Sequence, residues 1–172
     1  MSIVNQARKF AEHWHRHQVR KYTNEPYFVH LHEVATLCAG AGLSKRAVAA
    51  AYLHDVIEDQ PVTYENVRER FGREVADIVR ELTDTPATVG VTREERKLND
   101  LGRLEAASAD AQSIKCADLV SNTSSITKHD RSFARVYLPE KRAVLMVLTR
   151  ANPELLALAW KTLKEAEAHL NA

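Results

Sequence analysis

The residues best suited to chemistry are His54, Asp55, Glu58 and Asp59, which follow an alanine-rich apolar run. Positions three and four apart share one side of a helix, so the imidazole and the carboxylates can converge near one helix end. Neighbouring carboxylates repel each other, and their burial is costly unless a cation neutralises them. Taken alone, the cluster therefore indicates either a divalent metal site or a solvated acidic helix end, with about equal weight.

A buried helix is expected to position this cluster. The run from Val48 to Leu53 is rich in alanine, which favours a helix that can lie close to its neighbours. Ser44 is the expected N-cap of this helix. The acidic cluster would then extend from the C-terminal end of the helix into a cleft.

Helical periodicity recurs along the whole chain, and no segment shows the alternation of a β-strand. We therefore expect an all-α fold, a compact bundle of about eight or nine helices in a single domain over residues 1–172. Gly42 and Gly72 are expected to end helices, and Thr92 and Asp110 to cap them. The other predicted helical segments are residues 3–18, 28–41, 64–71, 73–82, 133–149 and 153–169, with a loop over 83–91.

Composition excludes several classes of protein. The 172 residues are 45% apolar and 27% charged, and no run approaches the ~20 apolar residues of a membrane span. A net charge of +1 gives no broad basic surface for nucleic acid or a membrane.

Cys38 and Cys116 lack the spacing of a metal site, and their side chains are expected to fill space in the buried core. Without a signal-peptide pattern, the expected location is the cytoplasm. The oligomeric state stays open. Leu156 and Trp160 of the last helix are expected to belong to the core, although an interface between subunits would also suit them.

Two further groups of polar residues could bind a ligand. Arg20 and Lys21 precede a loop with Pro26, where they could hold a phosphate or stack on a base, although a solvated basic pair is the commoner case. Asp118, Ser121, Asn122 and Ser125 share one face of an otherwise apolar helix. A hydrogen-bonded Asp–Asn pair would explain that face without a ligand.

The order of His30, His54-Asp55 and Asp118 resembles that of the HD-domain metal phosphohydrolases. The surrounding residues are more specific and are similar to the hydrolase domain of the RelA/SpoT alarmone enzymes, especially the free-standing small hydrolases of the Mesh1 type. The similarity covers about residues 3–150, and the chain is too short for the synthetase and regulatory domains of the long members, so a hydrolase alone is expected. The segments that carry the resemblance are 20–21, 26–30, 34–35, 53–59, 71–72 and 114–118 with Asn122.

The resemblance implies that a metal ion is bound by His30, His54, Asp55 and Asp118. Two imidazoles and two carboxylates suit a borderline-to-hard divalent ion. The family's usual ion is Mn²⁺, while the chemistry of the ligands also fits Zn²⁺, Fe²⁺ or Co²⁺.

The resemblance also implies the reaction and the residues that assist it. Glu58 and Asp59 match the catalytic acidic pair, which would position the attacking water or relay its proton. Hydrolysis at the phosphorus on the ribose 3′ oxygen of (p)ppGpp would release pyrophosphate. The residues expected to contact the small-molecule nucleotide are Arg20, Lys21, Asn122 and Ser125.

The chain departs from the family's pattern in ways that affect specificity. Asn122-Thr123-Ser124 stands where the long enzymes usually have Asn-x-Arg, so one cationic contact is absent. The loop over 83–91 also lacks the run of residues that is usual in the family, and Leu31 stands where the family commonly has proline. The same chemistry on (p)ppApp or on the 2′-phosphate of NADPH therefore remains open, as does a catalytically silent nucleotide-binding module. The intact His54-Asp55 and Glu58-Asp59 pairs argue against the silent module.

Overall fold

The computed structural model describes residues 1–84, 86, 89–124 and 126–172, and these ranges contain helices and no β-strand. Among them, nine helices have at least eight residues and two have a single turn, which confirms the all-α prediction. The helices are α1 (Ile3–Trp14), α2 (Phe28–Gly40), α3 (Lys45–Leu53), α4 (Val56–Asp59), α5 (Tyr64–Phe71), α6 (Arg73–Leu82), α7 (Arg93–Ala106), α8 (Ala109–Thr123), α9 (Ile126–His129), α10 (Arg131–Val147) and α11 (Pro153–Asn171).

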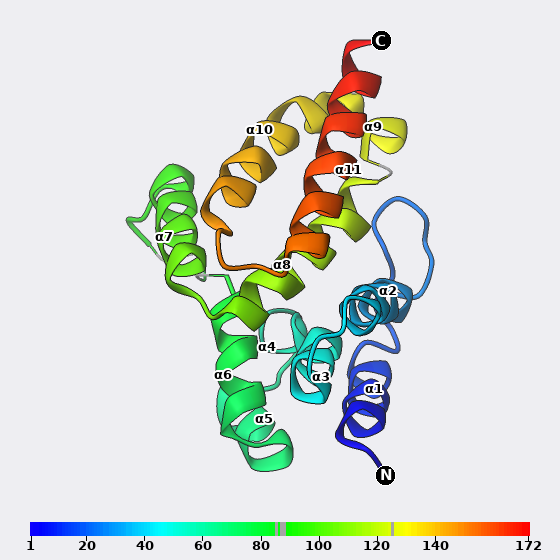
Figure 1. Cartoon of the computed structure of the whole chain (residues 1–172), viewed down its shortest axis with the longest axis vertical. Coiled ribbons are helices and arrows are strands. Elements are labelled where there is room, and N and C mark those ends of the chain that lie inside the picture. Colours follow the sequence, from blue (N-terminus) through cyan, green and yellow to red (C-terminus); the bar gives the residue numbers. More distant parts are fainter. Residues whose placement is uncertain (85, 87–88, 125) are drawn as a thin grey trace.

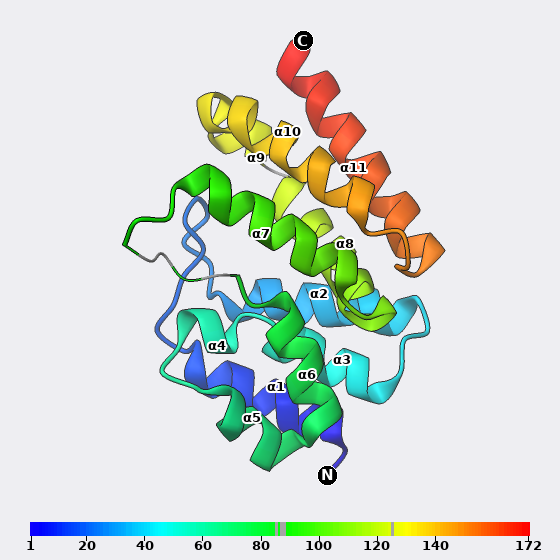
Figure 2. The same ribbon diagram turned by 90° about the vertical axis from the view of Figure 1, so that its left-hand side faces the viewer.

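Helix α8 lies at the centre of the arrangement (Figure 1). Helices α2, α3 and α6 contact it from one side, and α10 and α11 contact it from the other (Figures 1 and 2). Helix α1 packs on α2 and α3, and α5 packs on α6. Polar side chains on α8 can therefore reach groups from both halves of the chain.

Helix α3 is the most completely buried short helix. Every residue from Ala47 to Leu53 is buried, and Ala49, Ala50 and Ala51 have no exposed surface. Because alanine side chains end at Cβ, helices α1, α2 and α6 can all pack against α3. The last turn of α3 is thereby held rigidly, as the alanine-rich run predicted.

Two of the three predicted helix N-caps, Ser44 and Thr92, are confirmed. The Ser44 side chain caps α3, and Thr92 forms a capping box with Glu95 at the start of α7. Asn152 caps α11, which begins at Pro153.

The predicted cap of α8 is wrong, because Ser108 caps this helix in place of Asp110. The Ser108 hydroxyl oxygen accepts a hydrogen bond from the Ala111 N–H at 3.2 Å and donates one to Glu81 Oε2 at 2.6 Å. Ser108 has extended backbone angles, whereas Asp110 already lies within the first helical turn. A cap needs non-helical angles, so Ser108 is the residue that can accept the free N–H.

The first helix is shorter than predicted and ends at Trp14 instead of Gln18. The buried His15 ring contacts Gln18, with 2.6 Å between Nδ1 and Oε1. Residues 18–27 then form a narrow loop in which the Tyr27 N–H donates to the Gln18 carbonyl at 2.9 Å. Asn24 has φ = 57°, which lets this loop turn back.

The apolar residues behave as the sequence predicted. Cys38 and Cys116 are free and buried, and burial raises the pKa of each thiol to about 12. Leu156 and Trp160 are half-buried and pack against the core. Among the described residues, no helix has the length and the apolar character that crossing a bilayer requires.

Candidate active site

The chain breaks its helical path at His54 and Asp55, so the helical spacing considered for His54 and Glu58 does not apply. Helix α3 ends at Leu53 and the single-turn helix α4 begins at Val56. The His54 ring folds back on α3, where its Nδ1 donates a hydrogen bond to the Ala51 carbonyl at 2.8 Å. That carbonyl belongs to the last turn of α3, whose carbonyls lack partners within the helix. The break separates His54 and Asp55 from the Glu58-Asp59 turn.

Three distant segments meet around His54 and Asp55. His30 of α2 and Asp118 of α8 complete a cluster in which His30 Nε2 lies 3.4 Å from Asp118 Oδ1 and 3.7 Å from Asp55 Oδ2. His54 Nε2 lies 3.0 Å from Asp55 Oδ2 and 3.7 Å from Asp118 Oδ1. The structure thus brings together the four residues that the sequence predicted as a group.

Hydrogen bonds orient both imidazoles toward the centre of this cluster. The Ser121 hydroxyl donates its hydrogen to Glu33 Oε2 at 2.6 Å, so its oxygen accepts from His30 Nδ1 at 2.8 Å. His54 Nδ1 is likewise a donor, to the Ala51 carbonyl. In a neutral imidazole this leaves the Nε2 lone pair available. Both Nε2 atoms are buried and have no hydrogen-bond partner among the described residues, which is what a site for a metal ion requires.

The two carboxylates are also held in place. Asp55 Oδ2 accepts a hydrogen bond from the Tyr27 hydroxyl at 2.6 Å. Asp118 accepts from Lys115 Nζ at 2.8 Å and from the Asn122 side-chain amide at 2.7 Å. Each carboxylate therefore has a fixed orientation toward the two imidazoles.

Electrostatics keep the cluster ionised despite its burial. Burial opposes ionisation of Asp118 and Asp55, but Lys115 and His54 outweigh it and hold the pKa of each carboxyl below its ordinary value. Burial also opposes protonation of His54, yet Asp55 and Asp118 raise its pKa well above the ordinary value. A divalent cation can replace the protons that these groups attract, so the residues fit such an ion.

A cavity of about 410 Å³ adjoins the cluster, and Asp55 and Asp118 form one of its walls. Predicted residues that also line it are Arg20, Lys21, Glu58 and Asn122.

Two predicted residues remain, Asp59 and Ser125. Asp59 is not among its lining residues, and its Oδ2 accepts a hydrogen bond from the Gln18 side-chain amide at 2.8 Å. Ser125 lies outside the described residues.

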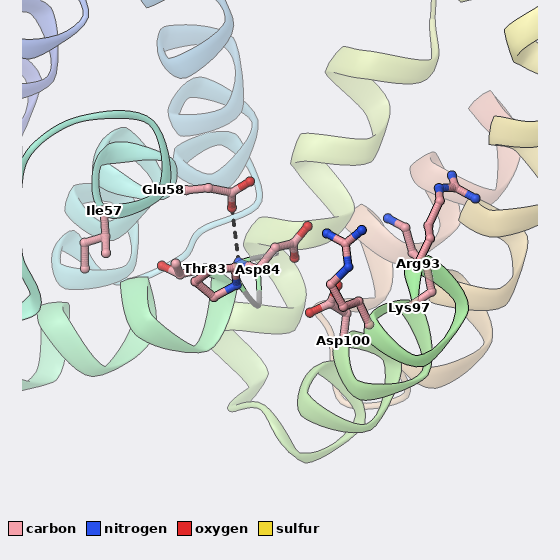
Figure 3. A pocket seen from close by; sticks show the side chains of 9 residues that line it. Ile57, Glu58, Thr83, Asp84, Arg93, Lys97 and Asp100 are labelled. Carbon is pink, nitrogen blue, oxygen red and sulfur yellow. Dashed lines mark hydrogen bonds between the residues drawn. The ribbon is translucent and has the colours of Figure 1, made fainter. Parts of the chain in front are cut away.

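Glu58 lies between this cavity and a second one of about 500 Å³. Its Oε2 accepts a hydrogen bond from the Asp84 N–H at 3.1 Å, and Figure 3 shows Arg93, Lys97 and Asp100 of α7 across the space from this pair. Burial, together with the negative charges of Asp84 and Asp55, raises the pKa of Glu58, and the hydrogen bond from the Asp84 N–H opposes this only in part. A carboxyl with a raised pKa beside the histidine cluster is suited to proton transfer.

The predicted basic pair has two different environments. The Arg20 guanidinium donates to Ser121 and Asn122 of α8 and lies 3.8 Å from Glu33 Oε2. Lys21 Nζ lies 5.1 Å from the ring centroid of Tyr22 and 5.7 Å from that of Phe133. Arg20 is therefore fixed against α8, whereas Lys21 lies among aromatic rings at the cavity.

Several residues of the site were not singled out from the sequence. Tyr27 and Lys115 hold the carboxylates, and Gln18 holds Asp59. Ser121, which was expected only as a member of a polar helix face, orients His30. Lys115 and Ser121 had a local signal, since each lies three residues from Asp118 on one helix. The Tyr27–Asp55 contact joins residues 28 positions apart, which periodicity cannot show.

The comparison with protein families identifies this fold. The family model described as "HD domain" matches residues 7–144. The chain belongs to the HD-domain family. The match covers every predicted metal ligand and confirms the resemblance to HD-domain hydrolases.

Named relatives of this HD-domain protein are alarmone enzymes. A guanosine-3′,5′-bis(diphosphate) 3′-pyrophosphohydrolase of Aquifex aeolicus is 42% identical over 80 residues, and MESH1 of Drosophila melanogaster, which carries the same enzyme name, is 37% identical over 117 residues. The matches cover 46% and 66% of this chain. The chain spans only 11% of the first relative and 64% of the second.

Solved structures agree with these sequence relatives. A structure titled "A metazoan ortholog of SpoT hydrolyzes ppGpp and plays a role in starvation responses" has a TM-score of 0.85, 25% identity and 96% coverage of both chains. The protein lmo0812 of Listeria monocytogenes EGD-e has a TM-score of 0.67 at 25% identity, covering 84% of this chain and 98% of that one. The all-α HD arrangement is therefore shared over nearly the whole chain.

Proposed function

We propose that this HD-domain protein is a metal-dependent nucleotide pyrophosphohydrolase and that its substrate is guanosine-3′,5′-bis(diphosphate) or a close analogue. The observation that carries the proposal is the convergence of two buried Nε2 atoms, which have no hydrogen bond among the described residues, with two carboxylates beside a cavity. The enzyme names of the relatives support the choice of substrate.

The metal site consists of His30, His54, Asp55 and Asp118. A divalent ion bound there supplies a Lewis acid that lowers the pKa of a water molecule and polarises a phosphoryl oxygen. We propose Mn²⁺ as the native ion; Zn²⁺, Fe²⁺ and Co²⁺ suit the same nitrogen and oxygen ligands.

The residues of the chain perform the remaining tasks. Glu58 lines the cavity and accepts the proton of the attacking water, while Lys115 keeps Asp118 ionised. Arg20 and Lys21 bind the base or phosphates of the nucleotide. The bond between the phosphorus and the ribose 3′ oxygen breaks, this oxygen takes up a proton, and pyrophosphate leaves.

The other predicted contacts belong to this proposal in different ways. Asn122 lines the cavity near the sugar, although its amide is bonded to Asp118. Asp59 acts less directly than Glu58, because it does not line the cavity. Ser125 stays a prediction, as do a single domain over residues 1–172 and the cytoplasm as location.

A panel of substrates tests the proposed specificity. The purified protein with Mn²⁺ would be incubated with ppGpp, ppApp and NADPH at equal concentrations, and the released products would be separated by ion-exchange chromatography. We expect pyrophosphate and GDP from ppGpp at the highest rate. Faster release from ppApp or NADPH would contradict the choice of guanosine, and no turnover of any of the three would favour a silent binding module.

Two substitutions test the assignment of roles within the site. Asp55→Ala should abolish both metal retention and turnover, because it removes a ligand. Glu58→Gln should keep the metal but slow turnover by about 10²-fold or more, because the amide cannot accept a proton. Turnover at the normal rate in both variants would defeat the mechanism.

A further inference from the structure

Lys141 of α10 is a cation at the cavity that the proposed mechanism does not use. Its side chain is half-buried and lines both the 410 Å³ cavity and a smaller one of about 110 Å³. Its Nζ lies 4.9 Å from the ring centroid of Tyr137, which also lines the larger cavity. Within the described residues Lys141 forms no ion pair with a carboxylate.

Three carboxylates of its neighbourhood are already paired with other cations. Asp118 accepts from Lys115 Nζ at 2.8 Å. Asp84 and Glu140, which line the smaller cavity with Lys141, are paired with Arg103 and Arg93. None of these three carboxylates forms an ion pair with Lys141.

The environment makes an unpaired ammonium costly. Burial, and then the nearby positive charge of Lys115, lowers the pKa of Lys141 to about 8. Leu119 and Ile126 add apolar surface to the same cavity. A buried charge of this kind is stabilised when an anion binds next to it.

We propose that Lys141 binds a phosphate group of the nucleotide that the metal site does not hold, and so contributes to substrate specificity. This proposal rests on the proposed function, because it takes the ligand to be a nucleotide with two phosphorylated positions. The cationic contact that the Asn122-Thr123-Ser124 segment lacks would then be supplied by α10. A lysine is suited to this task as a compact charge that can approach a phosphate from one side.

Binding of GDP and guanosine to the Mn²⁺-loaded protein, measured by calorimetry, tests the proposal. GDP carries the 5′ phosphates that would reach Lys141, and guanosine carries none. We expect Lys141→Met to weaken GDP binding about tenfold and to leave guanosine binding unchanged, with Lys141→Arg close to the wild type. Wild-type affinity for GDP in Lys141→Met would overturn the proposal, and so would an equal loss for both ligands.

Controls separate this effect from charge or folding. Lys164→Met removes the same charge from an exposed position of α11 and should bind GDP like the wild type. Thermal melting checks that the variants fold, and Lys141→Gln replaces Lys141→Met if that variant does not. In turnover of ppGpp, Lys141→Met should raise KM about tenfold with kcat little changed, as expected for a contact kept from ground state to transition state.

The GDP titration does not depend on catalysis. A wild-type protein that hydrolyses none of the tested nucleotides would defeat the proposed function, while the GDP titration would still decide the role of Lys141.

Discussion

At the scale of the residue, the candidate site depends on groups that orient the predicted ligands. Tyr27 is the clearest case, because its hydroxyl donates to Asp55 Oδ2 at 2.6 Å. The Tyr27 ring also stacks on the buried His15 ring at a centroid distance of 5.4 Å, which fixes the direction of the hydroxyl. Hydrogen bonds to metal-binding carboxylates fix their orientation and tune the affinity of the site.

Tyr27→Phe should therefore weaken metal binding about tenfold without unfolding the protein. The measurement is the Mn²⁺ dissociation constant, with thermal melting as the check on folding. Tyr64→Phe is the matched control, since the Tyr64 hydroxyl donates to Asp77 Oδ1 at 2.7 Å away from the site. Equal Mn²⁺ affinities for Tyr27→Phe and the control would show that Tyr27 has no such role.

The pH dependence of turnover should report the Glu58 carboxyl. Its pKa is raised by burial, and it accepts a proton only when ionised. Activity should therefore fall as the pH is lowered, with a midpoint above the ordinary value of about 4.3 for glutamate. The measurement is the pH profile of kcat, and Glu58→Gln should remove this acidic limb from its residual activity. An acidic limb that persists unchanged in Glu58→Gln would assign the titration to another group.

The sequence was informative about the ligands and less informative about the groups that hold them. Helical spacing indicated the Asn122–Asp118 hydrogen bond, because both residues lie on α8. His30, His54, Asp55 and Asp118 could be predicted because their order and flanking residues match a known pattern. Contacts such as Ser121–His30 join residues 91 positions apart. They depend on how α8 packs across α2, which local propensity does not specify.

At the scale of the element, the decisive feature is the break between α3 and α4. A continuous helix would have placed His54 beside Glu58. The structure instead turns His54 back onto the Ala51 carbonyl, and Asp55 is the N-cap of the single-turn helix α4. The periodicity of Val48–Leu53 predicted the buried helix correctly but could not predict where it stops, since no glycine or proline marks the end.

The cap of α8 offers a test at this scale. Ser108→Ala should lower the free energy of unfolding by about 1–2 kcal/mol, because it removes the acceptor for the Ala111 N–H and the donor to Glu81. Asp110→Ala should change it by less than about 0.5 kcal/mol. Urea unfolding curves of both variants give these values. The opposite ranking would restore Asp110 as the cap.

At the scale of the whole molecule, the site couples parts of the chain that are far apart. His30 comes from α2, His54 and Asp55 from the turn after α3, and Asp118 from α8 at the centre of the fold. An ion that binds all of them stabilises the folded state over the unfolded chain, in which the ligands are dispersed.

Removal of the metal should therefore lower the melting temperature. At a free ion concentration of 100 times the dissociation constant, the stabilisation is about 2.7 kcal/mol, or roughly 5–10 °C for a protein of this size. Calorimetric melting with Mn²⁺ and with a chelator gives the difference. Asp118→Ala should show almost no difference in melting temperature between the two conditions. A wild-type protein that melts at the same temperature with Mn²⁺ and with the chelator would contradict metal binding by the folded state.

The most direct test of the account is the anomalous scattering of a Mn²⁺-soaked crystal, collected at the manganese edge. We predict one peak between α2, α8 and the turn after α3, within about 2.0–2.3 Å of His30 Nε2, His54 Nε2 and the carboxylates of Asp55 and Asp118. A peak held by other residues, or no peak among these four side chains at saturating Mn²⁺, would contradict the central claim that they form one metal site.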